Sequence, residues 1–380
     1  MLDTSARTAF NDEHELFRDS VRRFLAREAT PHLDRWEEQG AIDIEFWRKA
    51  GEAGLLCAQV SPAYGGLGLD FGYNAVIAEE LGYLGSTAGI GLHSDIVAPY
   101  IEAYGSEELK HHWLPKMISG ETPSAIAMTE PAAGSDLQGI KTTAIADGED
   151  YILNGSKTYI TNGQQAELII VVAKTDPSEG AKGTSLILVE ADRPGFARGR
   201  NLDKIGLHGQ DTSELFFQDV RVPKGNILGA EGMGFAYLMN QLPQERLGIA
   251  IGAQASAQRA FDEAVSFTKQ RKAFGRTVFE FQNTRFTLAD LKAKLQVGWA
   301  HLDWALARHM AGKLTASEAS AAKLWHTELQ WEVCDAALQL HGGAGYMNEY
   351  LIARLWRDAR VTRIFGGTNE IMKEVIGRAL

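Results

Sequence analysis

The chain has few of the features that mark secreted, membrane or zinc-binding proteins. Its 380 residues include two cysteines, Cys57 and Cys334, too few for a disulfide framework and without the paired spacing of a zinc or thioredoxin motif. No run of about 18 apolar residues is present to span a bilayer, and the first residues lack the charged-then-apolar pattern of a secretory signal. These absences predict a cytoplasmic protein that forms no disulfides and does not enter a membrane.

Positive charge is also scarce. Lysine and arginine total 38 against 49 aspartates and glutamates, which gives a formal net charge of −11. Proteins that bind nucleic acid usually gather basic residues on one face, so this balance argues against a nucleic-acid partner.

Familiar phosphate-binding and metal-binding motifs are missing as well. The sequence contains no G-x-x-x-x-G-K-[ST], no G-x-G-x-x-G after a predicted strand and no H-E-x-x-H, so a P-loop, a Rossmann nucleotide fold and a zincin are each unsupported. His111 and His112 are neighbours, and adjacent residues of a helix point to different faces. We therefore expect no metal site.

The first block of the chain, residues 1–122, is dominated by helical signals. After Asn11-Asp12, which can cap a helix, the apolar residues Val21 and Leu25 fall on one helical face. Further helices are predicted over 44–53, 74–81 and 107–118.

Residues 123–232 have instead the short apolar runs of β-structure, separated by glycine, proline and aspartate. Asn154-Gly155 lies between two such runs, and this pair favours the positive φ angles of a tight hairpin. Strands are predicted over 151–153, 157–161, 168–173, 185–190 and 214–222. We expect this block to form a β-barrel or sandwich.

Residues 233–380 return to long helical segments rich in alanine, leucine, lysine, glutamine and glutamate. Helices are predicted over 235–251, 254–271, 285–311 and 316–340. Long helices with short connections indicate a bundle. The chain is therefore predicted to be an α+β multidomain protein with an N-terminal α-helical domain (1–122), a middle β-barrel domain (123–232) and a C-terminal four-helix bundle (233–380).

Five glycine-containing segments are too unusual in composition to be explained by packing alone. They are 128–136 (MTEPAAGSD), 159–163 (YITNG), 270–275 (QRKAFG), 339–346 (QLHGGAGY) and 364–371 (IFGGTNEI). Taken singly, each is consistent with a turn or a helix cap. In the last segment, Thr368 is suited to cap a helix whose amino end would hold an anionic oxygen. Their joint occurrence in this order favours a functional role.

In this order the segments closely resemble those of the acyl-CoA dehydrogenase family, and the resemblance runs from about residue 13 to residue 378. The resemblance implies the same three-domain architecture, with FAD bound non-covalently. It implies removal of the α and β hydrogens of an acyl-CoA thioester and transfer of electrons to electron-transfer flavoprotein. It also implies a homotetramer, which is the family's usual state.

The resemblance further implies which residues contact the cofactor. Arg271, Phe274 and Gln282 match residues that reach the FAD of a neighbouring subunit, where a guanidinium can make bidentate bonds to the diphosphate. Ser135 matches a residue that faces both the flavin and the CoA arm. The other implied FAD-binding residues are Met128, Thr129, Tyr159, Ile160, Thr161, Gln339, Gly343, Thr368 and Asn369.

The position of the catalytic base departs from that of most family members. Many members have a glutamate where this chain has Gly366, and glycine cannot abstract a proton. Relatives that act on long-chain and isovaleryl thioesters carry the glutamate on a helix of the C-terminal domain, immediately before an arginine, which matches Glu245 and Arg246. The segments LPQERL (242–247) and GGTNEIMKE (366–374) look most like those of the long-chain acyl-CoA dehydrogenase branch. The alternative is that Glu245 and Arg246 are a solvated helix pair with no catalytic role.

The implied substrate contacts are Ser135, Arg246 and Gly366. An apolar acyl tunnel would raise the pKa of a glutamate base from about 4.3 toward the operating pH. The missing side chain at Gly366 would also free room near the reacting carbon, which predicts that substrates branched near the thioester can enter.

Two other classes of function remain open from the sequence. One is an acyl-CoA oxidase or a flavin monooxygenase on the same scaffold, in which reduced flavin reacts with oxygen. The other is a non-catalytic protein that binds acyl-CoA or a partner and has lost its base at Gly366.

Overall fold

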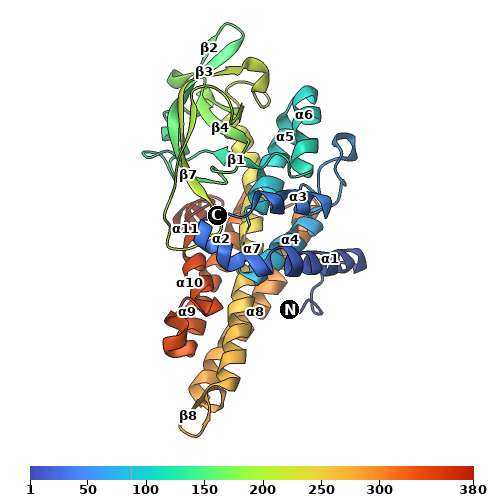
Figure 1. Cartoon of the computed structure of the whole chain (residues 1–380), viewed down its shortest axis with the longest axis vertical. Helices are drawn as coiled ribbons and strands as arrows, with labels where there is room; N and C mark the ends of the chain where they lie inside the picture. Colours follow the sequence, from blue (N-terminus) through green and yellow to red (C-terminus); the bar gives the residue numbers. More distant parts are fainter. Residues whose placement is uncertain (87) are drawn as a thin grey trace.

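The computed structural model describes residues 1–86 and 88–380. Figure 1 shows an elongated molecule with the β-sheet at its upper end, the N-terminal helices beside its centre and the long C-terminal helices running to its lower end. Within these described residues, no helix is both long enough and apolar enough to cross a membrane.

The N-terminal block is helical, as predicted. Asn11 begins α1 with a capping box, since its side chain accepts a hydrogen bond from the backbone N–H of His14 and the His14 side chain accepts one from the Asn11 backbone. The predicted helix over 107–118 is present as α6. The helices of this block are α1 (Asp12–Glu28), α2 (Leu33–Gln39), α3 (Ile44–Glu52), α4 (Phe71–Leu84), α5 (Ala98–Tyr104) and α6 (Glu107–Ile118), with a π-helical turn, η3 (Leu92–Val97), before α5.

The middle block is a single curled sheet. Its strands are β1 (Ser124–Ala127), β2 (Thr143–Asp147), β3 (Asp150–Thr161), β4 (Leu168–Lys174), β5 (Thr184–Glu190), β6 (Phe196–Asn201) and β7 (Thr212–Pro223). They lie in the order β1-β4-β2-β3-β7-β6, and β5 pairs with β4. In the described chain no ladder joins β6 to β1 or β5, so the predicted barrel is open along one side.

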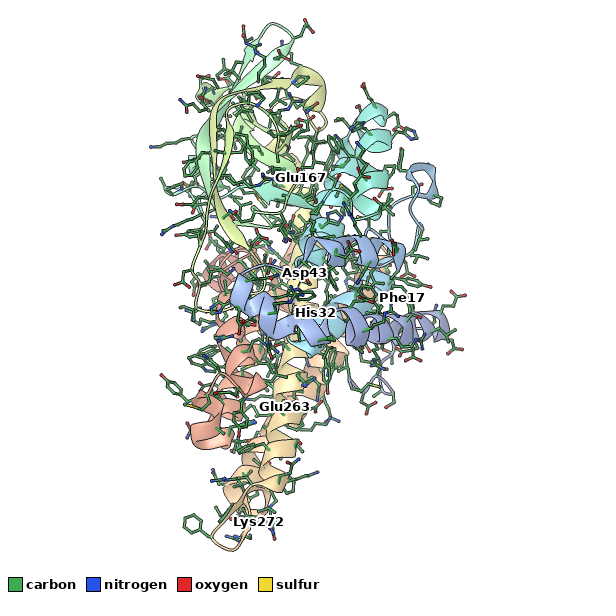
Figure 2. All side chains as sticks on the ribbon, viewed as in Figure 1. Phe17, His32, Asp43, Glu167, Glu263 and Lys272 are labelled. Carbon is green, nitrogen blue, oxygen red and sulfur yellow. The ribbon has the colours of Figure 1, made fainter. Side chains whose placement is uncertain are left out.

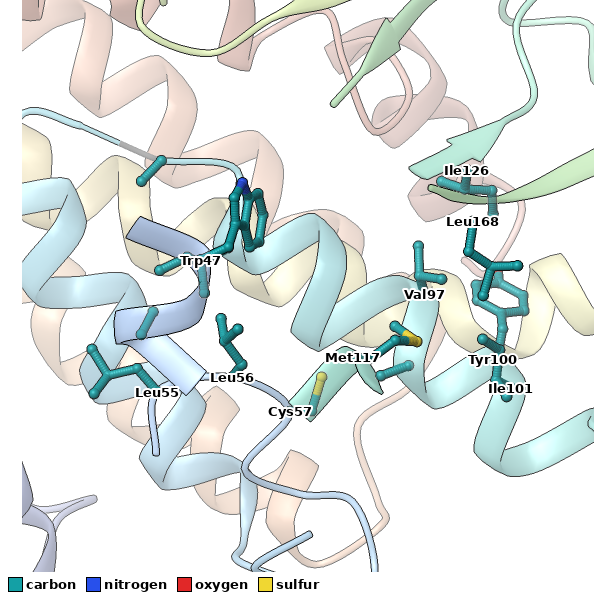
Figure 3. Packing of buried hydrophobic residues seen from close by; sticks show 14 of the residues in the cluster. Trp47, Leu55, Leu56, Cys57, Val97, Tyr100, Ile101, Met117, Ile126 and Leu168 are labelled. Carbon is teal, nitrogen blue, oxygen red and sulfur yellow. The ribbon is translucent and has the colours of Figure 1, made fainter. Parts of the chain in front are cut away.

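Strand β4 explains why residues 168–173 read as a continuous apolar run. Leu168 and Ile170 face the core that is shared with the N-terminal helices, whereas Ile169 and Val171 face the interior of the sheet domain. Because both faces are buried, the strand lacks the usual polar alternation. Figure 3 shows Leu168 close to Tyr100, so α5 and the sheet are packed in one core.

The predicted hairpin at Asn154-Gly155 is wrong. Strand β3 continues through this pair, and the reversal lies at Gly148, between β2 and β3. At Gly155 the pairing of β3 with β7 shifts register, and a Cβ atom on Gly155 would overlap Oγ1 of Thr142. The glycine therefore marks a bulge where two segments approach closely. Such a bulge favours glycine, as a tight turn does.

The C-terminal block is built on three long helices. A single helix, α7, replaces the two predicted over 235–251 and 254–271, because the residues between them remain helical. Helix α7 packs against both α4 and α9. The elements are α7 (Gly234–Gln270), β8 (Lys272–Ala273), β9 (Arg276–Thr277), α8 (Gln282–Met310), α9 (Ala316–His341), α10 (Leu351–Thr362) and α11 (Asn369–Gly377).

Candidate active site

Glu245 lies in the first half of α7, where the helix passes between the N-terminal domain and the other C-terminal helices. Its side chain is buried, with 6% of the residue exposed. The phenol of Tyr100 on α5 donates a hydrogen bond to Oε1 of Glu245 over 3.0 Å, and Tyr100 itself is fully buried. A solvated helix pair is therefore excluded for Glu245.

Burial sets the acid-base properties of this carboxyl group. Loss of hydration raises the pKa of Glu245 from 4.5 to about 7, while the Tyr100 hydrogen bond and the charge of Arg246 act in the opposite direction. Burial also raises the pKa of Tyr100 well above its ordinary value, so its hydroxyl stays a hydrogen-bond donor. Glu245 is thus poised to take or give a proton near neutral pH.

Arg246 is buried beside Glu245 and is held by α9. Its Nη1 donates to Oγ of Ser320 over 3.0 Å, and no described residue accepts a hydrogen bond from its Nε. Burial lowers the pKa of Arg246, against the opposing effect of Glu245. An unpaired donor buried next to the candidate base is consistent with a ligand in this region.

Gly366 lies against the same stretch of α7. Its φ of +62° disfavours any residue with a Cβ, and a Cβ atom there would overlap Cδ1 of Ile249. Ile249 is one helical turn after Glu245. The absence of a side chain at Gly366 was expected to leave room for a branched substrate. Ile249 fills that room, so this expectation is corrected.

Open space lies instead beside Gly248. A Cβ atom built on Gly248 would meet no atom of the described residues within 4 Å, although Gly248 lies inside α7. A glycine inside a helix costs about 1 kcal/mol relative to alanine. The space beside Gly248, one helical turn from Glu245, would let a ligand approach the helix backbone.

Two of the predicted cofactor segments lie side by side in the sheet domain. The backbone N–H of Thr158 donates to the carbonyl of Thr129 over 2.9 Å, which joins the segment after β1 to the end of β3. Beneath them, Lys157 donates from Nζ to the carbonyl of Met128 and to Oε1 of Glu130. Lys157 is fully buried, and no motif in the sequence marked it as part of this site.

The exposed side of this pair of segments fits a flat ring. Tyr159 is 68% exposed and has a φ of +59°, which is uncommon for an aromatic residue and marks a constrained backbone. Ile160 is buried and Thr161 is partly exposed. Ser135 is exposed and lies six residues after Thr129 in the sequence. An exposed aromatic face beside partly exposed Met128 and Thr129 suits an isoalloxazine ring.

A second set of predicted cofactor residues gathers at the far end of the molecule. Arg271 directly precedes β8, and Phe274 lies in the turn between β8 and β9. Figure 1 places this hairpin at the lower tip, where Figure 2 labels Lys272. Phe274 is 94% exposed with a φ of +53°. Gln339 and Gly343 reach the same end, because the ring of His341 stacks on that of Phe267 near the end of α7. Gln282, also exposed, begins α8.

One chain therefore does not bring the two sets together. The sheet set consists of Met128, Thr129, Ser135, Tyr159, Ile160 and Thr161, and the hairpin set of Arg271, Phe274, Gln282, Gln339 and Gly343. The sheet domain and the β8–β9 hairpin lie at opposite ends of the long axis in Figure 1. Ile160 is buried, and the other residues of the two sets are exposed or partly exposed.

Thr368 and Asn369 have different roles in the structure. Thr368 caps α11, since its hydroxyl accepts a hydrogen bond from the N–H of Ile371. The carboxamide of Asn369 is buried and is used within the chain, because it accepts from Lys323 and donates to Thr327 and Glu328. These bonds tie α11 to α9 after the turn that contains Gly366, and the predicted cofactor contacts of Thr368 and Asn369 stay predictions.

Comparison with known proteins gives matches along the whole chain. The sequence matches the N-terminal domain of acyl-CoA dehydrogenases over residues 11–121, the middle domain over 125–220 and the C-terminal domain over 232–380. It is 50% identical over 383 residues to the long-chain specific acyl-CoA dehydrogenase, mitochondrial, of Sus scrofa, covering 100% of this chain and 89% of the relative.

Solved structures agree with these matches. An acyl-CoA dehydrogenase from Geobacillus kaustophilus superposes with a TM-score of 0.97 at 53% identity and covers 98% of this chain and 99% of its own. A glutaryl-CoA dehydrogenase from Mycobacterium smegmatis in complex with FADH2 superposes with a TM-score of 0.92 at 28% identity and covers 98% of this chain and 95% of its own.

Proposed function

Because the chain belongs to the acyl-CoA dehydrogenase family, an oxidoreductase family that acts on CH–CH bonds of acyl-CoA thioesters, we propose that Glu245 is the base of its α,β-dehydrogenation. The observation that supports Glu245 most directly is its burial with a hydrogen bond from Tyr100. In this proposal a carboxylate from α7 replaces the one that other members carry at position 366, and the contact of Gly366 with Ile249, one helical turn after Glu245, supports it.

The family is one of flavoproteins, and FAD is the cofactor that the site residues fit. Met128, Thr129 and Tyr159 would hold the ring, with Ile160, Thr161 and Ser135 around it. When bound, FAD supplies the acceptor for the β-hydride. The buried Lys157 holds the carbonyl of Met128 in place and keeps this segment in position.

The proton chemistry belongs to Glu245 and its neighbours. The α-proton of the thioester passes to the Glu245 carboxylate, whose pKa of about 7 leaves it sufficiently ionised and basic at neutral pH. Tyr100 donates to one carboxylate oxygen and leaves the other free for the proton. Arg246 keeps a positive charge close to the carboxylate and would contact the substrate with its free donor.

A second copy of the chain would complete the cofactor site. Arg271, Phe274 and Gln282, with Gln339 and Gly343, are too far from the sheet set to serve the same FAD within one chain, so they would hold the diphosphate and adenosine of a neighbour's FAD. This arrangement is consistent with a homotetramer. Electron-transfer flavoprotein would be the electron acceptor, and the cytoplasmic location expected from the sequence stays a prediction, since the pig relative is named mitochondrial.

Anaerobic titration tests this function. The purified, FAD-loaded protein is titrated with unbranched acyl-CoA thioesters while flavin absorbance is recorded, and we expect the absorbance to fall in proportion to added thioester. Thioester binding without any loss of absorbance would favour a non-catalytic protein. Rapid recovery of the flavin absorbance in air, without electron-transfer flavoprotein, would favour an oxidase or a monooxygenase.

A further inference from the structure

The segment between α10 and α11, the Gly366 turn (residues 363–368), is held by a fully buried lysine, Lys323 of α9. We propose that Lys323 is a positioning residue of the dehydrogenation, because it fixes this turn against the side chain of Arg246. The inference rests on the proposed function, which takes Glu245 as the base and Arg246 as the charged group beside it.

Lys323 makes hydrogen bonds to two groups at the end of the Gly366 turn. Its Nζ donates to the carbonyl of Gly367 over 2.9 Å and to Oδ1 of Asn369 over 2.8 Å. The backbone N–H of Asn369 donates to the carbonyl of Arg363 over 3.0 Å, which joins the two ends of the turn. Loss of the Lys323 amine would therefore loosen the whole turn.

The Gly366 turn also borders α7. A Cβ atom on Gly366 would overlap Cδ1 of Ile249, and a Cβ atom on Gly367 would lie 3.8 Å from Nη2 of Arg246. The turn thus lies against α7 as well as α9, and the guanidinium of Arg246 lies beside its Gly367 end. When the turn moves, this boundary of the guanidinium moves with it.

One face of α9 serves both Arg246 and the Gly366 turn. Ser320, Lys323 and Thr327 are three and four residues apart, so their side chains lie on the same face of the helix, and all three are buried. Ser320 accepts a hydrogen bond from Nη1 of Arg246. Thr327 accepts one from the carboxamide of Asn369. Lys323 lies between them, so one rigid helix sets the position of the turn relative to the guanidinium.

Lys323 is costly to bury. Both of its acceptors are uncharged oxygens, and burial is the main cause that lowers the pKa of Lys323 from 10.5 to about 8. Replacing buried charged groups with apolar side chains of similar volume is often neutral for stability. Lys323→Met is therefore expected to fold, so its effect on the turn can be measured.

The test measures flavin reduction by dodecanoyl-CoA in the FAD-loaded protein. We expect Lys323→Met to lower the reduction rate about 10- to 100-fold, because a displacement of about 1 Å near a reacting group has an effect of this size. Lys323→Gln, which keeps an uncharged donor, is a milder second variant and should lose less. Thioester affinity, measured by isothermal titration in the Glu245→Gln background, should change little when Lys323→Met is added.

A matched control weakens a buried interaction away from the turn. Asp303 of α8 is buried and accepts from Nε of Arg7 over 2.6 Å. Asp303→Asn removes the charge of this pair and should reduce flavin at the wild-type rate. A loss in Asp303→Asn equal to that in Lys323→Met would overturn the inference, because any weakened core contact would then have the same effect.

A double-mutant cycle separates positioning from a general loss of structure. If Lys323 acts through Arg246, adding Lys323→Met to Arg246→Gln should cost less than about twofold in rate. A loss of the same size in both backgrounds, or a wild-type rate in both Lys323 variants, would overturn the inference and leave the proposed function intact. Absence of flavin reduction by any thioester in wild type would overturn both.

Discussion

The hydroxyl of Tyr100 donates a hydrogen bond to Oε1 of Glu245 across the boundary between the N-terminal helices and α7, over 3.0 Å. Both residues are buried, and they come from segments 145 residues apart. A hydrogen bond to the charged form of a carboxyl group favours that form and lowers its pKa. Tyr100 thus limits how far burial can raise the pKa of the base.

Replacing Tyr100 with phenylalanine should move the working pH of the base upward. A hydrogen bond to a charged group is worth about 1.5–3 kcal/mol, and one pKa unit corresponds to about 1.4 kcal/mol. We expect the pH at half-maximal flavin reduction to rise by about one unit or more in Tyr100→Phe. The control is Tyr104→Phe, one turn later on α5, which should leave the pH profile unchanged. An unshifted profile in Tyr100→Phe would mean that the phenol does not act on the base.

The raised pKa of Glu245 also predicts how stability depends on pH. Folding raises this pKa from 4.5 to about 7, so the folded protein binds the proton more tightly than the unfolded chain does. The contribution of this group to stability is therefore present below pH 4.5 and is lost as the pH rises to about 7. Glu245→Gln removes the penalty, which is on the order of 3 kcal/mol above pH 7.

Thermal unfolding of the two proteins at two pH values measures this effect. The Tm of Glu245→Gln should exceed that of wild type at pH 8, and the difference should shrink at pH 5. A difference that is the same at both pH values would show that Glu245 is not buried with a raised pKa.

Gly248 should show a conflict between stability and activity. Because a Cβ atom at this position meets no neighbour, Gly248→Ala should stabilise α7 by about 0.5–1 kcal/mol. Gly248→Phe should fill the open volume and weaken acyl thioester binding while FAD content stays normal. Denaturant titration and thioester titration measure the two effects. Tight thioester binding by Gly248→Phe would show that the acyl chain lies elsewhere.

Arg271 should matter for cofactor retention although it lies far from the sheet set. Losing a charge-assisted bond of about 1.5–3 kcal/mol corresponds to a roughly 10- to 100-fold weaker FAD affinity in Arg271→Ala. Lys272→Ala, at the neighbouring exposed position, should retain FAD normally. FAD affinities can be measured by fluorescence on reconstitution of the apoprotein. Equal FAD affinities in both variants would show that Arg271 does not contribute to FAD binding.

Local sequence patterns were enough to predict the three blocks of the fold, whereas the choice of Glu245 as the base came from the family resemblance and stays a prediction. The capping residues, the apolar runs and the motif order all act over short distances along the chain, so they can be read without a structure. Asn154-Gly155 was misread because a bulge and a turn require the same glycine, and only the partner strands distinguish them.

Contacts between distant segments could not be predicted in this way. Nothing in the sequence places Tyr100 next to Glu245, or Ile249 in the space left at Gly366, because both contacts depend on how α7 packs against other elements. The internal use of Asn369 was likewise hidden, since its partners Lys323 and Thr327 lie on α9.

Flavin reduction in Glu245→Gln tests the central claim most directly. The FAD-loaded variant is mixed anaerobically with dodecanoyl-CoA beside wild type and Glu370→Gln, which changes an exposed carboxylate close to the Gly366 turn. Loss of a general base typically costs about 10²- to 10⁴-fold in rate. We predict such a loss in Glu245→Gln, with FAD and thioester still bound, and a wild-type rate in Glu370→Gln. Reduction of Glu245→Gln at the wild-type rate would contradict the assignment of the base.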